Sequence, residues 1–126
     1  MPGEEFARTP WTEDPDWIWD RSTNPGLTKE ATLLATVQAS SGGIELAVAR
    51  FTKTMGKVGP NHWSLGGADI VVAYPTSSTA ELRIISSGED ALESLTDAAH
   101  LTFNRLIAPN PSLLVQWTQL PLRPGP

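Results

Sequence analysis

The chain has no cysteine among its 126 residues. Disulfide bonds, thiolate nucleophiles and cysteine-ligated metal sites are therefore excluded. No apolar run approaches the ~18–20 residues that a membrane-spanning helix needs, so we expect no membrane partner. The acidic start, residues 1–5, lacks the basic residues and the apolar run of a signal peptide. These absences predict a cytoplasmic protein or a virion component, without choosing between them.

Positive charge is also scarce, with 9 Lys and Arg against 14 Asp and Glu and a net charge of −5. Because nucleic-acid binding needs a basic stripe that contacts phosphates, we expect no direct binding of DNA or RNA. The acidic excess is unevenly spread. Residues 1–21 hold six acids and two bases, a net of −4, whereas residues 22–126 hold eight acids and seven bases, a net of −1. The N-terminal segment therefore carries the charge, and the rest of the chain is nearly neutral.

Signals of catalysis are weak. The chain has only two histidines, and no dinucleotide, phosphate-loop, zinc-protease or nucleophile-elbow motif accompanies them. His100 falls within an expected helix, where Asp97 and Asn104 are its neighbours at helical spacing. His62 lies in a glycine-rich loop beside Trp63 and before Asp69. We expect no metal and no cofactor, and keep as the alternative a small enzyme or ligand-binding domain with a pocket at His62, Trp63 and Asp69.

Three of the five tryptophans stand in one acidic stretch, residues 11–19. Large rings belong in cores or interfaces, since each can bury roughly 150–250 Å². Pro10 and Pro15 interrupt any helix or central strand there, so the stretch must lay its rings on something else. That surface is either the body of the same chain, with the stretch as a strap, or another protein. In the second case the residues expected to bind the partner are Trp11, Asp14, Asp16, Trp17, Ile18, Trp19 and Asp20.

Turn residues divide the chain into three parts. Residues 1–26 are expected to form an extended acidic arm that ends at Asn24-Pro-Gly. Residues 27–119 are expected to form one α+β domain. Residues 120–126 form a proline-rich tail, for which a polyproline-like conformation is expected.

Residues 30–51 fit two patterns. As strands, alternating apolar residues on both sides of Ser40-Ser-Gly-Gly predict a β-hairpin. As a helix, Ile44, Val48 and Phe51 recur at spacings of four and three, and Met55 and Val58 continue the stripe. We favour the hairpin, because the glycine pair and the β-rich first half agree with it.

The second half is more regular. Residues 69–74 and 79–86 predict two strands, and residues 112–118 a third. Between them, residues 88–107 predict a helix whose apolar stripe includes Leu95 and Phe103. Ser86 and Glu89 have the spacing of a capping box at the start of this helix. The order strand, helix, strand over residues 79–118 also allows a parallel crossover.

A helix packed on one face of an antiparallel sheet is the simplest assembly of these elements. We therefore expect an α+β two-layer sandwich, with a mostly antiparallel sheet of about five strands, one main helix and an extended N-terminal arm. The expected function is that of a non-catalytic interaction or assembly protein that docks through the arm. It would be a self-assembling subunit, for example of virion or phage type, or an inhibitor of a partner protein. A homo-oligomer is the expected state.

Overall fold

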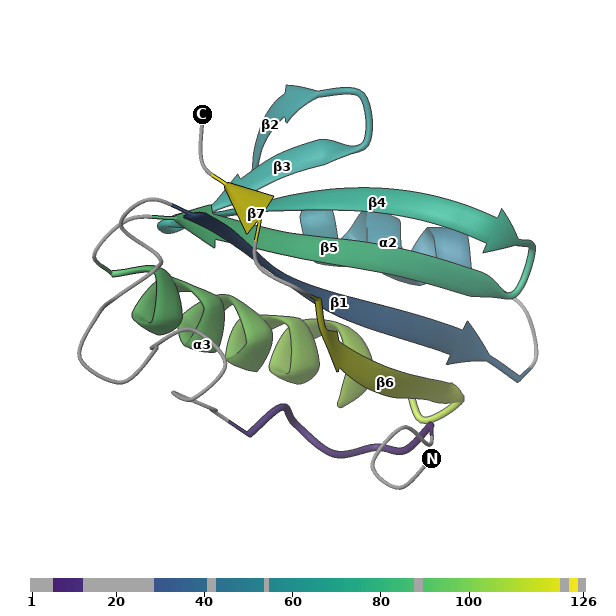
Figure 1. Ribbon diagram of the computed structural model, residues 1–126. Helices are drawn as coiled ribbons and strands as arrows, with labels where there is room; N and C mark the ends of the chain where they lie inside the picture. The colour runs from purple at the N-terminus through teal and green to yellow at the C-terminus, as the bar shows by residue number, and fades with distance from the viewer. Residues whose placement is uncertain are drawn as a thin grey trace.

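The computed structural model describes residues 6–12, 29–40, 43–53, 55–87, 90–120 and 123–124. Within these residues, six strands form one antiparallel sheet in the order β2-β3-β4-β5-β1-β6 (Figure 1). The strands are β1 (Lys29–Ala39), β2 (Gly56–Gly59), β3 (His62–Leu65), β4 (Ala68–Thr76), β5 (Thr79–Ser87) and β6 (Leu113–Gln119). A short further strand, β7 (Arg123–Pro124), pairs with the start of β1.

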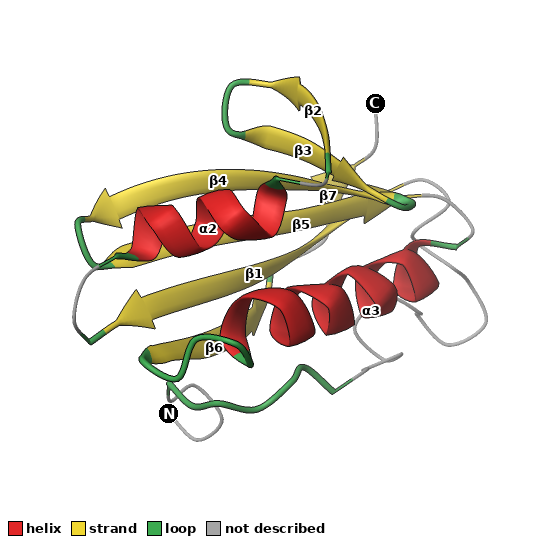
Figure 2. Ribbon diagram, turned by 180° about the vertical axis from the view of Figure 1, so that it is seen from behind, coloured by secondary structure: helices red, strands yellow, loops and turns green. Residues whose placement is uncertain are grey.

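Two helices cover one face of the sheet, as Figure 2 shows. Helix α2 (Ile44–Thr52) packs against β5, and α3 (Ala91–Thr102) packs against β5 and β4. A π-helical turn, η2 (Phe103–Ile107), extends α3 and contacts α2 and β6. The expected α+β sandwich with an antiparallel sheet is therefore confirmed, with six strands on the main path of the sheet and two helices rather than about five and one.

Alternation along the strands explains why the helices pack on this face. In β1 the odd-numbered residues from Ala31 to Ala39 are buried, whereas Gln38 is exposed on the other face. The register places Leu33 opposite Ile84, and Ile84 opposite Ile70, so aliphatic side chains of three strands meet beneath the helices. The helices add buried residues of their own: Ile44, Ala47, Val48, Phe51, Leu95, Ala98 and Ala99. Burial of each large aliphatic side chain contributes about 1.5–3 kcal/mol, and this shared core joins the two layers.

Strand β1 lies between β5 and β6 and is antiparallel to both. Strands β5 and β6 therefore run in the same direction, and the chain passes from one to the other through α3. The crossover considered for residues 79–118 exists in this form, but β1 separates its two strands. Long-range pairing thus determines the centre of the sheet.

The hairpin favoured for residues 30–51 is wrong in its second half, where α2 begins at Ile44. Gly43 precedes the helix with a φ of 80°, a left-handed conformation that glycine adopts readily. Ile44 and Val48 are buried at helical spacing, whereas Leu46, which the alternating pattern placed inside, is 57% exposed. The helical interpretation is correct for Ile44, Val48 and Phe51, because their stripe packs on the sheet and this tertiary contact outweighs the turn signal. It is wrong for Met55 and Val58, which lie beyond the end of α2 at Thr52.

Two further boundaries differ from the sequence expectation. Residues 56–65, expected as a loop, form the hairpin β2–β3, whose turn contains Asn61 at a φ of 54°. Helix α3 begins at Ala91 with Asp90 as its N-cap, whereas Ser86 belongs to β5. Ser86 therefore does not cap the helix. Its predicted partner, Glu89, lies outside the described residues.

Candidate functional site

Residues 6–12 of the expected arm lie against the body of their own chain. Ala7 and Val115 of β6 exchange two backbone hydrogen bonds of 3.0 and 2.8 Å. The indole of Trp117 donates a hydrogen bond of 2.9 Å to the carbonyl of Thr9. Figure 1 shows this segment in purple, next to β6. Residues 6–12 are therefore part of the folded unit.

Arg8 holds this segment to the end of the helical layer. Its guanidinium donates hydrogen bonds to four backbone carbonyls, those of Ile107, Ala108, Asn110 and Leu113, at 2.7 to 3.4 Å. The last carbonyls of a helix have no partner within the helix, and a cation there also complements the helix dipole. Arg8 thus ties residues 6–12 to the end of η2, to the turn that follows it and to the start of β6.

Trp11 completes the anchored segment. Its side chain is only 6% exposed and belongs to the hydrophobic core. Its indole N–H donates a hydrogen bond of 3.2 Å to the side-chain oxygen of Gln119. Trp11 was predicted to bind a partner, and the structure instead places it in the core of its own chain. The other predicted partner-binding residues, Asp14, Asp16, Trp17, Ile18, Trp19 and Asp20, lie outside the described residues.

The expected pocket at His62, Trp63 and Asp69 is divided between the two faces of the sheet. His62 pairs with Val71, and the next residue, Trp63, pairs with the buried Ile70. Successive residues of a strand point to opposite faces, so Trp63 packs against the core on the helical side. His62 and Asp69 share the other face. The structure therefore brings two of the three residues together.

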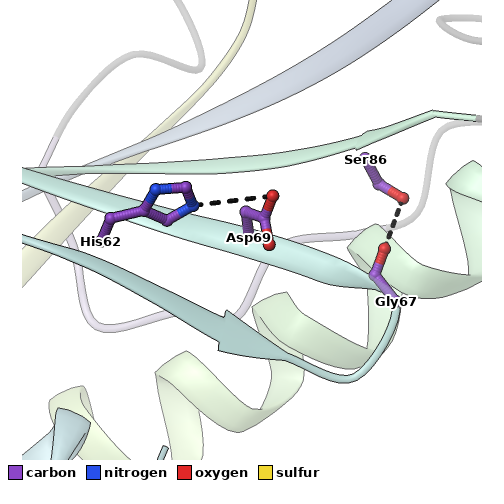
Figure 3. Close-up of polar contacts among 4 residues, drawn as sticks. All are labelled: His62, Gly67, Asp69 and Ser86. Atoms are coloured by element: carbon purple, nitrogen blue, oxygen red, sulfur yellow. Dashed lines mark hydrogen bonds and ion pairs between the residues drawn. The ribbon is translucent and has the colours of Figure 1, made fainter. Parts of the chain in front are cut away.

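His62 and Asp69 are the two ionisable residues of the expected pocket, and their side chains lie close together. The Nε2 atom of His62 lies 3.6 Å from Oδ2 of Asp69 (Figure 3). That Nε2 atom is buried and makes no hydrogen bond to the described residues. The two side chains form an ion pair only when His62 is protonated. The separation of Nε2 and Oδ2 is longer than a hydrogen bond. Ser64 of β3 pairs with Asp69 and so belongs to the same face of the sheet as His62 and Asp69, whereas His100 is exposed on α3.

The sequence analysis also missed where three exposed bases lie. Arg50 belongs to α2, Lys53 is its C-cap and Lys57 belongs to the edge strand β2. Leu46 of α2 and Val58 of β2 are exposed as well, at 57% and 60%. A signal was present in the sequence, because residues 46–68 hold three bases and no acid. The sequence did not show that a helix and an edge strand carry these bases.

Neither a metal site nor a membrane-spanning helix is found in the described part of the chain. No group of three or more His, Asp or Glu residues there is arranged to hold a metal ion. None of its helices has the length and apolar character required to cross a bilayer. Comparison of the chain with protein families, with curated proteins and with solved structures finds no significant match. Function is therefore inferred from the chain's own residues.

Proposed function

We propose that this protein is a non-catalytic interaction or assembly protein that docks through the acidic, tryptophan-bearing segment 13–20. The observation that supports this proposal is the anchoring of the residues immediately before the segment. Arg8 binds four carbonyls, and Trp11 is buried in the core. A segment that starts from a fixed point loses less freedom on binding than a free tail does.

The composition of the segment suits an interface. Trp17 and Trp19 are two residues apart, so in an extended chain both rings project to the same side. Tryptophan is enriched among the residues that dominate binding energy, and its truncation can cost about 2 kcal/mol or more. The segment also holds four acids and no base, which favours a basic partner surface.

The partner that fits these properties is a protein, either a sister subunit or another chain with a basic surface. Self-association is the primary form of the proposal and gives a homo-oligomer. An inhibitor that occupies a partner's groove uses the same segment in the same way. Direct binding of nucleic acid is not part of the proposal, because the segment is acidic.

Paired substitutions test this function better than truncation does. A chain that starts at Asn24 also loses Arg8 and Trp11, so it removes part of the fold together with the segment. We therefore compare the full chain with a Trp17→Ala/Trp19→Ala variant by sedimentation equilibrium and thermal melting. The proposal expects weaker association and an unchanged melting temperature. A lower melting temperature with unchanged association would show that the rings pack on their own body, and would contradict it.

A second candidate is a small enzyme or ligand-binding site at His62 and Asp69, supported by their 3.6 Å separation. Trp63 is not part of this candidate, because it packs on the opposite face. A His62→Ala/His100→Ala variant separates the two functions. The interaction protein keeps its biological activity, whereas loss of an acid–base group lowers turnover by ~100-fold or more with the fold intact.

A further inference from the structure

The two helices cover only one face of the sheet, and no other described element covers the second face. The buried residues Leu33, Ile84 and Ile70 lie in register and point toward the helices. Successive residues of a strand point to opposite faces, so the residues next to these three in sequence point away from the helices. We call this second face the open face. Figure 1 shows it toward the viewer, with α2 behind β4 and β5.

Three apolar side chains lie at the centre of the open face. Leu34 of β1 and Val71 of β4 are both paired with Arg83 of β5, and Ile85 lies two residues further along β5. Residues two apart in a strand share a face, so Leu34, Val71 and Ile85 are neighbours around Arg83. Each of the three is only partly buried. The solvated face of an antiparallel sheet usually carries polar residues at such positions.

The charged residues around this apolar centre form ion pairs within the same copy. Nε2 of His62 lies 3.6 Å from Oδ2 of Asp69, and Nη1 of Arg83 lies 3.5 Å from Oε1 of Glu81. The register and the alternation of the strands place all four residues on the open face. Both ion pairs that the described residues form therefore belong to this face.

One further acid, Glu30, lies at the end of the open face, where the register places Arg123 of β7 opposite it. By register position, three acids on this face therefore stand with two arginines and one histidine. A strongly charged ligand, such as a nucleic acid, finds no excess of opposite charge here. A surface with the same mixture of apolar groups and internally paired charges is a better match, and the open face of a second copy is such a surface.

The size of the open face also suits a dimer. Strands β3, β4, β5, β1 and β6 are separated by four spacings of about 4.8 Å, and a nine-residue strand such as β5 is about 30 Å long. The face they form therefore covers roughly 600 Å² in projection, and its accessible area is larger because side chains stand out from the backbone. A specific interface of standard size buries about 800 Å² on each partner.

We infer that the open faces of two copies pack against each other in a symmetric dimer, with the helices on the outside. Two such sheets have the same twist, so they pack about 10 Å apart with strand directions within about 30° of each other. A twofold axis brings identical patches together, so Leu34, Val71 and Ile85 of both copies meet at the centre. Polar residues of the flanking strands, such as Ser64 and Thr118, form the rim. The inference goes beyond the proposed function and does not rest on it, because segment 13–20 takes no part in this interface.

Substitution of Val71 tests the inference with the full-length chain. The first variant is Val71→Lys, and the matched control is Leu46→Lys, which makes the same kind of change at an exposed residue of α2. A milder variant, Val71→Thr, keeps the β-branched shape and serves if the lysine variant does not fold. Sedimentation equilibrium measures the dissociation constants at low and high salt, and melting temperatures verify that each variant folds.

We expect Val71→Lys to weaken self-association at least about tenfold, because each dimer then buries two new cations on facing surfaces. Val71→Thr weakens it by a smaller factor, and Leu46→Lys associates like the wild type. Salt changes the wild-type dimer little, since its charges are paired within each copy and apolar burial holds the copies together.

Distances between labels test the arrangement directly. The chain has no cysteine, so a single introduced cysteine carries a spin label at one chosen position. Labels at Thr36→Cys, two residues from Leu34 on the open face, should lie closer together in the dimer than labels at Leu46→Cys, because α2 faces outward. The opposite order of the two distances contradicts the inference.

Other outcomes separate the inference from the proposed function. If Val71→Lys dissociates the dimer and Trp17→Ala/Trp19→Ala does not, the inference stands and the segment docks on another protein. If the double tryptophan variant dissociates the dimer and neither variant of Val71 weakens it, the inference fails and only the proposed function stands. If the variants of Val71 lower the melting temperature at unchanged mass, the open face is covered within its own chain and the inference fails. A wild type that is monomeric at every concentration rejects both the inference and self-association through the segment.

Discussion

The buried hydroxyl of Ser86 donates a hydrogen bond of 2.8 Å to the backbone carbonyl of Gly67 (Figure 3). This contact joins the end of β5 to the turn between β3 and β4, 19 residues away in the chain. The sequence pattern assigned the same hydroxyl to the N-cap of a helix. In the structure this hydroxyl joins a strand to a turn and does not cap a helix.

Replacement of Ser86 should therefore destabilise the sheet. We expect Ser86→Ala to lower the free energy of unfolding by about 0.5–1.5 kcal/mol, because the hydrogen bond between β5 and the turn is lost. The control is Ser87→Ala, whose side chain is exposed one residue later in the same strand. Urea denaturation monitored by circular dichroism measures both, and equal effects would contradict the role of the hydrogen bond.

Arg8 should stabilise the fold through the carbonyls that it binds after α3. We expect Arg8→Ala to cost about 1–3 kcal/mol, since hydrogen bonds from a charged donor are the stronger ones. Arg8→Lys should recover part of the loss, because an ammonium cannot reproduce the planar fork. Arg105→Ala removes an exposed cation of η2 and should have little effect in the same denaturation experiment.

Trp11 should behave as a core residue and not as a partner-binding one. We expect Trp11→Ala to lower the free energy of unfolding by about 3–5 kcal/mol, the usual cost of removing a large buried ring. Trp11→Phe should cost less, because it keeps most of the ring and loses the hydrogen bond to Gln119. A melting temperature unaffected by Trp11→Ala would mean that the segment 6–12 does not pack as the structure shows.

The stripe of α3 gives a prediction inside one helix. Leu95 is fully buried against the sheet, whereas Glu93 is exposed two residues before it. We expect Leu95→Ala to cost about 2–5 kcal/mol and Glu93→Ala to leave stability nearly unchanged. Chemical denaturation compares the two variants. If both behaved alike, the helix would be rotated from its described position.

The only tyrosine, Tyr74, should titrate at high pH. Burial, and secondly the negative charge of Glu45, raise the pKa of Tyr74 above its ordinary value of 10.0. The folded state therefore favours the neutral phenol of Tyr74. The stability that this preference contributes is complete below pH 10 and is lost as the pH rises through the pKa of the folded state. Ultraviolet absorbance of the tyrosinate gives the midpoint, and Glu45→Gln should lower it partly. A midpoint at or below 10 in the folded protein would contradict this.

Local patterns predicted the elements whose partners are close in the chain. Strands β4 and β5 follow each other through a turn at Ser77–Ser78, and the stripe of α3 is continuous along one helix. The regions around α2 and β2–β3 were predicted wrongly for a physical reason. Alternating and helical patterns coincide over residues 44–51, and the tertiary contacts with β5 and η2 decide between them.

In the candidate site, too, the sequence showed local features but not the contacts between residues that are distant in the chain. The acidic tryptophan stretch was visible in the sequence, but the different role of Trp11 depends on Gln119, which is 108 residues away. The bases Arg50, Lys53 and Lys57 were also visible, but the sequence did not show that they lie on a helix and on an edge strand. A pair such as His62 and Trp63 looks like one site in sequence, and strand alternation separates it.

The central place of β1 has a consequence for the time at which the protein can fold. Ribosomes complete β1 early, yet its two neighbours come from residues 79–87 and 113–119, and the anchors of Arg8 and Trp11 come from residues 107–119. The nascent chain must therefore keep Leu33 and Val37 without both of their sheet partners until residues 79–119 have been made. Such non-local pairing also slows folding. We expect the sheet to close only after Gln119 has left the ribosome.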